Sequence, residues 1–112
     1  MDAMRDLRGL PKAHLHLHLA GGMRPATLAE LARVQGRRLP AELLDPAGAR
    51  LDVTARRGWS RFQRLYDAAR EVVQGPAEVQ RLVAEIAEDE RAAGSGWVEV
   101  QVDPSSYAAR LG

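Results

Sequence analysis

AHLHLHL at Ala13–Leu19 carries the strongest structural signal in this chain and holds its only three histidines, His14, His16 and His18. Apolar and polar residues alternate along it with a period of two, which is typical of a β-strand with one apolar face. The alternation predicts that all three imidazoles share one face of the strand. Residues two apart on one face lie about 6.5–7 Å from each other, so two imidazoles can reach one ion with bonds of about 2.0–2.1 Å. The stretch therefore predicts half of a metal site.

The composition is that of a small globular domain. Of the 112 residues, 46% are hydrophobic and 28% are charged, which allows one core and argues against a disordered tail. Sixteen basic and fifteen acidic residues leave a net charge of +1. Because the arginines are scattered among acidic residues and form no basic stripe, we expect no nucleic-acid partner.

The chain contains no cysteine, which excludes disulfides and thiolate-bound zinc. Any metal must therefore be held by imidazole and carboxylate groups. No apolar run approaches the about 18 residues that a membrane span needs, and the N-terminus lacks the apolar stretch of a secretory signal. We accordingly expect a soluble cytoplasmic protein with no membrane partner.

Periodicity and turn residues predict the other elements. The histidine strand is expected over about 12–19, with Gly21 and Gly22 allowing a tight exit from it. The remaining elements are helices over about 25–36, 58–74 and 76–93, a loop with a short turn of helix over 37–56, and a strand over about 97–102. The apolar stripes of the last two helices are expected to be Trp59, Phe62, Leu65, Tyr66, Ala69, Val72 and Val73, and Val79, Leu82, Val83, Ile86 and Ala87.

Strand, long helical excursion and strand is the order of a βαβ unit with a parallel sheet, which predicts the α/β class. Two parallel strands do not form a sheet that is stable alone. The pattern therefore predicts the opening segment of a larger α/β fold. The charged run Arg81–Arg91 is expected to be a solvated helix face.

The stretch Leu10–Pro25, LPKAHLHLHLAGGMRP, resembles the N-terminal signature of the adenosine deaminase family. In that signature Leu-Pro-Lys precedes His-x-His-Leu, and Gly and then Arg-Pro or Lys-Pro follow. A lone His-x-His is weak evidence for the family, whereas His-x-His framed by these residues at the right spacing is strong evidence. The resemblance continues more loosely to Trp97–Val100. It covers nearly the whole chain but about the first third of a family member.

The resemblance implies that residues 1–112 are the N-terminal βα segment of one (β/α)₈ TIM-type barrel domain, incomplete in this chain. It implies a Zn²⁺ cofactor, with His16 and His18 as two of the metal ligands. His14 falls outside that ligand pair and is expected to be an inward-facing polar residue lower in the barrel, satisfied by hydrogen bonds. Trp59 and Phe62 lie on a helix similar to the one that flanks the substrate mouth in the family, and ordinary core packing is the alternative for both.

The reaction that the resemblance implies is hydrolytic deamination of a small-molecule purine nucleoside or a related amino-heterocycle, with release of ammonia. Where the family has an acidic residue that contacts the sugar, this chain has Ala20, so the substrate is held differently or is not adenosine itself. Asp103 follows the second strand and is either a site residue or a turn starter. The family's third histidine ligand, its glutamate proton donor, its further histidine and its metal-binding aspartate have no counterpart here. No catalytic residue is therefore expected within this chain, which alone is expected to be inactive.

Two other interpretations stay open. The chain is an inactive truncated remnant or a subunit completed by another chain, because open strand edges and unpartnered helix faces are expected in it. Alternatively, the parent is a deaminase of a different amino-heterocycle, for which Ala20 is the motivation.

Overall fold

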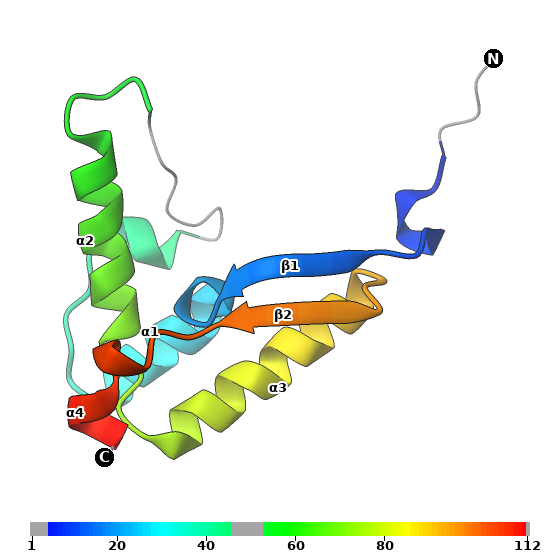
Figure 1. Ribbon diagram of the computed structural model, residues 1–112. Helices are drawn as coiled ribbons and strands as arrows, with labels where there is room; N and C mark the ends of the chain where they lie inside the picture. Colours follow the sequence, from blue (N-terminus) through cyan, green and yellow to red (C-terminus); the bar gives the residue numbers. More distant parts are fainter. Residues whose placement is uncertain (1–4, 46–52, 112) are drawn as a thin grey trace.

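The computed structural model describes residues 5–45 and 53–111 and has a mixed α/β architecture (Figure 1). Two parallel strands, β1 (Ala13–His18) and β2 (Trp97–Gln101), form the sheet. Helix α3 (Pro76–Ala92) lies along one face of this sheet. Helix α2 (Gly58–Arg70) stands at the end of the sheet to which both strands point. The carboxyl ends of the strands therefore meet α2.

Helix α1 (Pro25–Val34) follows the histidine strand, and Pro25 occupies its first turn, where a missing N–H costs nothing. It ends at Val34, just before Gly36 with φ 67°, and so two residues earlier than the expected boundary. The sequence pattern predicts one of the five short elements, the turn of helix within 37–56, and does not predict the other four. These short elements are η1 (Leu7–Gly9), η2 (Ala20–Gly22), η3 (Ala41–Leu44), η4 (Pro104–Ser106) and α4 (Ala108–Leu111). Residues 46–52 of the expected loop lie outside the described residues.

Helix α2 ends at Arg70, whereas the apolar pattern predicts helix to residue 74. Val72 and Val73 follow it in a tight turn, and both are fully buried. Val72 packs among the helices, and Val73 packs on the sheet side. The chain leaves the helix here because two consecutive residues pack into two different clusters.

Apolar side chains bury in two adjoining clusters, one between α1, η3 and α2 and the other between the sheet, α3 and the C-terminal turns. The first contains Leu28, Ala32, Leu43, Leu65, Ala69 and Val72, and the second contains Leu19, Val73, Leu82, Ile86 and Tyr107. The expected stripe of α3 is too broad, since Val83 is 49% exposed and Ala87 is also exposed. A two-stranded sheet covers only a narrow line of the helix. No helix in the described part of the chain is long and apolar enough to cross a membrane.

The exit from β1 depends on Gly22, which lies against α3. A Cβ at this position would lie 2.8 Å from both Cγ1 and Cδ1 of Ile86 and 3.2 Å from Cδ2 of Leu17. Both neighbours pack in the sheet cluster, so neither is free to move aside. At Gly21 the nearest heavy atom would be 3.7 Å away, which is ordinary contact. Only Gly22 is therefore required for the close approach to α3.

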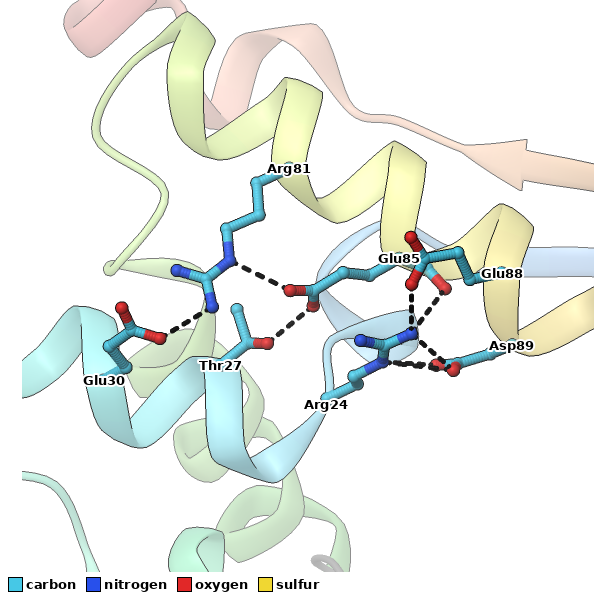
Figure 2. Close-up of polar contacts among 7 residues, drawn as sticks. All are labelled: Arg24, Thr27, Glu30, Arg81, Glu85, Glu88 and Asp89. Carbon is cyan, nitrogen blue, oxygen red and sulfur yellow. Dashed lines mark hydrogen bonds and ion pairs between the residues drawn. The ribbon is translucent and has the colours of Figure 1, made fainter.

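Helices α1 and α3 are joined by a charged network (Figure 2). Arg24 donates through Nε and Nη2 to both carboxylate oxygens of Asp89, at 2.8–3.1 Å, and through Nη2 to Glu88 at 2.9 Å. Arg81 donates to Glu30 at 2.7 Å and to Glu85 within its own helix at 2.9 Å. The expectation of a merely solvated Arg81–Arg91 face is therefore wrong. Alternating charges on α3 meet partners on α1 that are about 50–65 residues distant in sequence.

Thr27 forms the buried centre of this network. Its hydroxyl is 2.6 Å from Oε2 of Glu85 and donates to it, while Arg81 holds the other oxygen. Burial alone would raise the pKa of Glu85, but the hydrogen bonds from Thr27 and Arg81 hold it below its usual range. A carboxyl whose pKa is lower in the folded state stabilises that state above its unfolded-state pKa. The contribution is lost as pH falls through the folded-state pKa.

We predict that Gly22→Ala lowers the free energy of unfolding by about 1–3 kcal/mol, because the added methyl overpacks the contact with Ile86. The neighbouring Gly21→Ala serves as the matched control and is expected to change stability by less than about 0.5 kcal/mol. Urea unfolding of the native protein that carries these residues measures both. Equal losses for the two variants would contradict the packing described for Gly22.

We also predict that Thr27→Val, which keeps shape but removes the hydroxyl, costs about 1 kcal/mol at pH 7. Without the hydroxyl, the pKa of Glu85 rises toward its ordinary value, so the difference from the wild type should shrink below about pH 4.5. Urea unfolding at pH 7 and pH 3.5 makes the comparison. A difference that stays constant between the two pH values would show that Glu85 is not the group through which Thr27 acts.

Candidate functional site

Strand β1 is irregular in its middle. His14 pairs with Val98 and Leu17 pairs with Val100, so β1 has one residue more than β2 between these two pairs. That count is the signature of a β-bulge. Within it, His16 has φ 62°, the left-handed region that few non-glycine residues enter. The histidine strand is therefore bulged, whereas the period-two pattern predicts a regular strand.

The bulge separates the histidines. His14 faces α3, with Nδ1 2.5 Å from Oε1 of Glu90, while His16 and His18 are exposed on the opposite side, here called the open face. The prediction that three imidazoles share one face is wrong, because the extra residue shifts the alternation by one position. His14 is hydrogen-bonded as expected, but it contacts a helix instead of facing inward. Hydrogen bonds from Ser95 and His14 hold the pKa of Glu90 below its usual range.

His16 and His18 are brought together by the bulge. Their ring centroids are 5.0 Å apart, with an angle of 67° between the rings. An imidazole centroid lies about 3.2 Å from an ion bound at about 2.0–2.1 Å, so two such rings at a tetrahedral angle are about 5.2 Å apart. Within the described residues neither ring has a hydrogen-bond partner, which leaves its nitrogens available. The pair therefore fits the requirement for two ligands of one zinc ion.

The described residues supply no further ligand at this place. Among them no group of three or more histidine, aspartate or glutamate side chains is arranged to hold a metal ion. The described residues therefore offer two imidazoles at this place and not a complete set of ligands. A complete site would take its other ligands from outside the residues described.

A cavity of about 300 Å³ opens beside His18 at the carboxyl ends of the strands. The rings of His18 and Tyr66, the latter on α2, form a T-shaped pair with centroids 6.2 Å apart, and Trp59 stacks on Phe62 at 6.0 Å. Trp59 is 63% exposed and so lies at the rim of the cavity, not in the core. The complete lining is His18, Trp59, Phe62, Gln63, Tyr66, Arg70, Gln101, Asp103 and Tyr107.

The polar groups of the cavity are fixed by their neighbours. Burial raises the pKa of Tyr66, so its phenol is protonated at neutral pH. The Arg70 guanidinium lies 5.8 Å from the Tyr66 ring centroid and donates to Ser106 at 3.0 Å. Hydrogen bonds from Ser106 and Ser105 hold the pKa of Asp103 below its usual range. Asp103 thus caps η4, as a turn starter does, and also lines the cavity.

The sequence pattern indicates His18, Trp59, Phe62 and Asp103 as candidate site residues, and the cavity contains all four. It did not identify Arg70 or Gln101 as cavity residues, and it assigned Tyr66 to an apolar stripe. A signal was present, because Phe62, Tyr66 and Arg70 are spaced four apart and share one line along α2.

Ala20 lies in a second cavity, which shares Phe62 and Tyr66 with the first. It is 5% exposed, and this apolar cavity has a volume of about 220 Å³. Its methyl side chain offers no hydrogen bond. The surroundings of residue 20 are therefore apolar, at the position where Ala20 predicts a substrate that is held differently or is not adenosine itself.

A sequence comparison identifies the family. The model described as Adenosine deaminase matches residues 11–112, and the chain belongs to the adenosine deaminase family.

Individual relatives agree with this assignment. A Streptomyces coelicolor protein named "Putative adenosine/adenine deaminase" is 57% identical over 116 residues, covering 100% of this chain and 34% of the relative. An "Adenosine deaminase" of Mycolicibacterium vanbaalenii is 35% identical over 91% of this chain and 29% of the relative. An "Adenine deaminase" of Caulobacter vibrioides is 29% identical over 93% of this chain and 29% of the relative. The chain thus spans about a third of the length of the curated relatives it matches. No solved structure matches it.

The bulge predicts that glycine stabilises position 16 relative to alanine, whereas a regular strand there predicts the opposite order. A non-glycine residue at φ 62° is strained by about 1–2 kcal/mol, so His16→Gly should unfold with a free energy about 1 kcal/mol higher than His16→Ala. At His18, whose backbone is that of an ordinary strand, the free energy of unfolding of His18→Gly should be about 0.5–1 kcal/mol lower than that of His18→Ala. Urea unfolding of the four variants in a chelator compares them without a metal contribution. The same sign at both positions would contradict the bulge.

Proposed function

We propose that this chain supplies two metal ligands and one wall of the substrate pocket to a zinc-dependent deaminase built on a (β/α)₈ barrel. The reaction is the hydrolytic removal of an amino group from an adenine-type ring, with release of ammonia. The observation that carries the proposal is the His16–His18 pair at 5.0 Å beside an aromatic cavity. Membership of the adenosine deaminase family supports it.

His16 and His18 would hold the ion together with ligands from outside the described residues. A zinc ion at this place supplies Lewis acidity that activates water at neutral pH. The contribution of this chain is to fix the pair: the bulge leaves His16 and His18 on the open face without His14, and the contact with Tyr66 limits the rotation of His18. The site lies at the carboxyl ends of the strands, where barrel enzymes carry their chemistry.

Helix α2 provides the proposed substrate wall. Trp59 and Phe62 present stacked aromatic surfaces, which suit a planar heterocycle and exclude water from it. Tyr66, protonated at neutral pH, offers a hydroxyl donor between them and His18. These side chains bind and orient the ring, and the proton transfers fall to groups outside this chain.

The substrate class follows from the apolar surroundings of Ala20. No hydrogen-bond acceptor stands at this position, so a sugar hydroxyl gains nothing there. We propose an amino-purine, either the free base or a nucleoside whose sugar is held elsewhere. The names of the relatives include both adenosine and adenine deaminases. A related amino-heterocycle is the second candidate, favoured by the same residue.

The first experiment isolates the native protein that carries this chain and determines its intact mass, metal content and ammonia release from adenosine and adenine. One zinc ion per protein and turnover of either purine support the proposal. A protein of 12.3 kDa that copurifies with no other chain and has no activity would support the inactive remnant instead.

The decisive variants are His16→Ala and His18→Ala in that protein. Each removes one ligand, so we predict that zinc is lost on dialysis and that kcat/KM falls by at least about a thousandfold. Arg33→Ala, at an exposed position on α1, is the control and should retain wild-type zinc content and turnover. Retention of zinc and activity by either histidine variant would overturn the assignment.

A further inference from the structure

We propose that the His14–Glu90 pair is a positioning device that holds β1 in its bulged form, so that His16 and His18 face the metal and His14 does not. The inference deepens the proposed function and rests on it, because the ion is the group toward which the pair acts.

The sequence of β1 favours a different arrangement. In a regular strand Leu15 would join Leu17 and Leu19 on the side of α3, and His14 would join the other histidines on the open face. In the observed strand Leu15 is 59% exposed and His16 has a left-handed backbone. Both features disfavour the bulge. A specific interaction must therefore compensate for them.

That interaction lies at the start of the strand. His14 Nδ1 is 2.5 Å from Oε1 of Glu90; the Glu90 side chain is only 15% exposed and the His14 side chain 43%, so the hydrogen bond is partly shielded from water. In a regular strand His14 would leave this carboxylate, and an apolar leucine would lie against it. Covering this partly buried carboxylate with an apolar side chain, in place of its hydrogen bond with His14, is unfavourable even though Ser95 still donates to it. Glu90 therefore selects the arrangement in which residue 14 faces α3.

Further contacts keep His14 and Leu17 at a fixed separation along α3. Before the bulge, Lys12 Nζ donates to the carbonyl of Ala93 at 2.9 Å, and its own carbonyl accepts from the Gly96 N–H at 3.0 Å. After the bulge, Leu17 packs against the sheet cluster that contains Ile86. The segment between these anchors has one residue more than β2 requires. The additional residue is accommodated at His16.

The consequence concerns which imidazoles form the pair. On a regular strand, His14 and His16 would have the same spacing as His16 and His18, about 6.5–7 Å along the strand. Two overlapping pairs would then compete for one ion. With His14 held by Glu90, one pair remains, with centroids 5.0 Å apart.

The test measures zinc affinity by chelator competition and the visible spectrum of the Co²⁺-substituted form, using the native protein that carries this chain. Glu90→Ala should weaken zinc binding about tenfold or more and change the Co²⁺ spectrum. Glu90→Gln keeps an acceptor for the His14 N–H and should restore both. His14→Ala should bind zinc as weakly as Glu90→Ala, and the double variant should bind it no more weakly than either single variant. Glu88→Ala is the matched control on the same helix, since Glu88 is exposed and contacts Arg24 instead of β1.

The outcomes are distinguishable. If the wild type binds no zinc, the proposed function fails, and the positioning role fails with it. If the wild type binds zinc and Glu90→Ala binds it equally well, the positioning role is overturned and the proposed function stands. Equal weakening by Glu90→Ala and Glu88→Ala would indicate general damage to α3 and would also overturn it.

Discussion

The docking of β1 on α3 is the contact on which the rest of the structure depends. Leu82, Ile86 and Glu90 are spaced four apart, so they form one line along the helix. The first two pack in the sheet cluster, whereas the third is a carboxylate. A strand that lies along this line must present apolar residues at one end and a polar residue at the other. β1 does so with Leu17 and His14, and the mismatch with its regular alternation is absorbed in the bulge at His16.

The residues that frame the histidines in the sequence motif all contact the same helix, α3. Lys12 donates to the carboxyl end of α3, Gly22 allows the chain to pass close to Ile86, and Arg24 binds Asp89. None of these three residues lines the cavity beside His18. The motif that indicates the family therefore combines two functions. Its frame fixes the strand and α1 on α3, and only His16 and His18 carry the proposed chemistry.

The elements of the fold could be predicted from the sequence to the extent that they are local. Helical periodicity, Pro25 and Pro76 indicated the three long helices, and the order of strands and helices indicated a parallel sheet. The bulge could not be predicted, because it depends on a carboxylate 76 residues from His14. The role of Arg81 and Asp89 was missed for the same reason, since a charged run shows its partners only after α1 has packed beside it.

The geometry separates the proposed metal chemistry from the choice of substrate. The spacing of His16 and His18 is set by the bulge, which α3 holds from the opposite face of the sheet. The substrate wall is set by α2 and by Ala20, at the end of the strands. The two parts meet at the edge contact between His18 and Tyr66. Substitutions in the wall can therefore change which amino-heterocycle fits while the ligand pair stays intact, as expected of a family whose members are named for both adenosine and adenine.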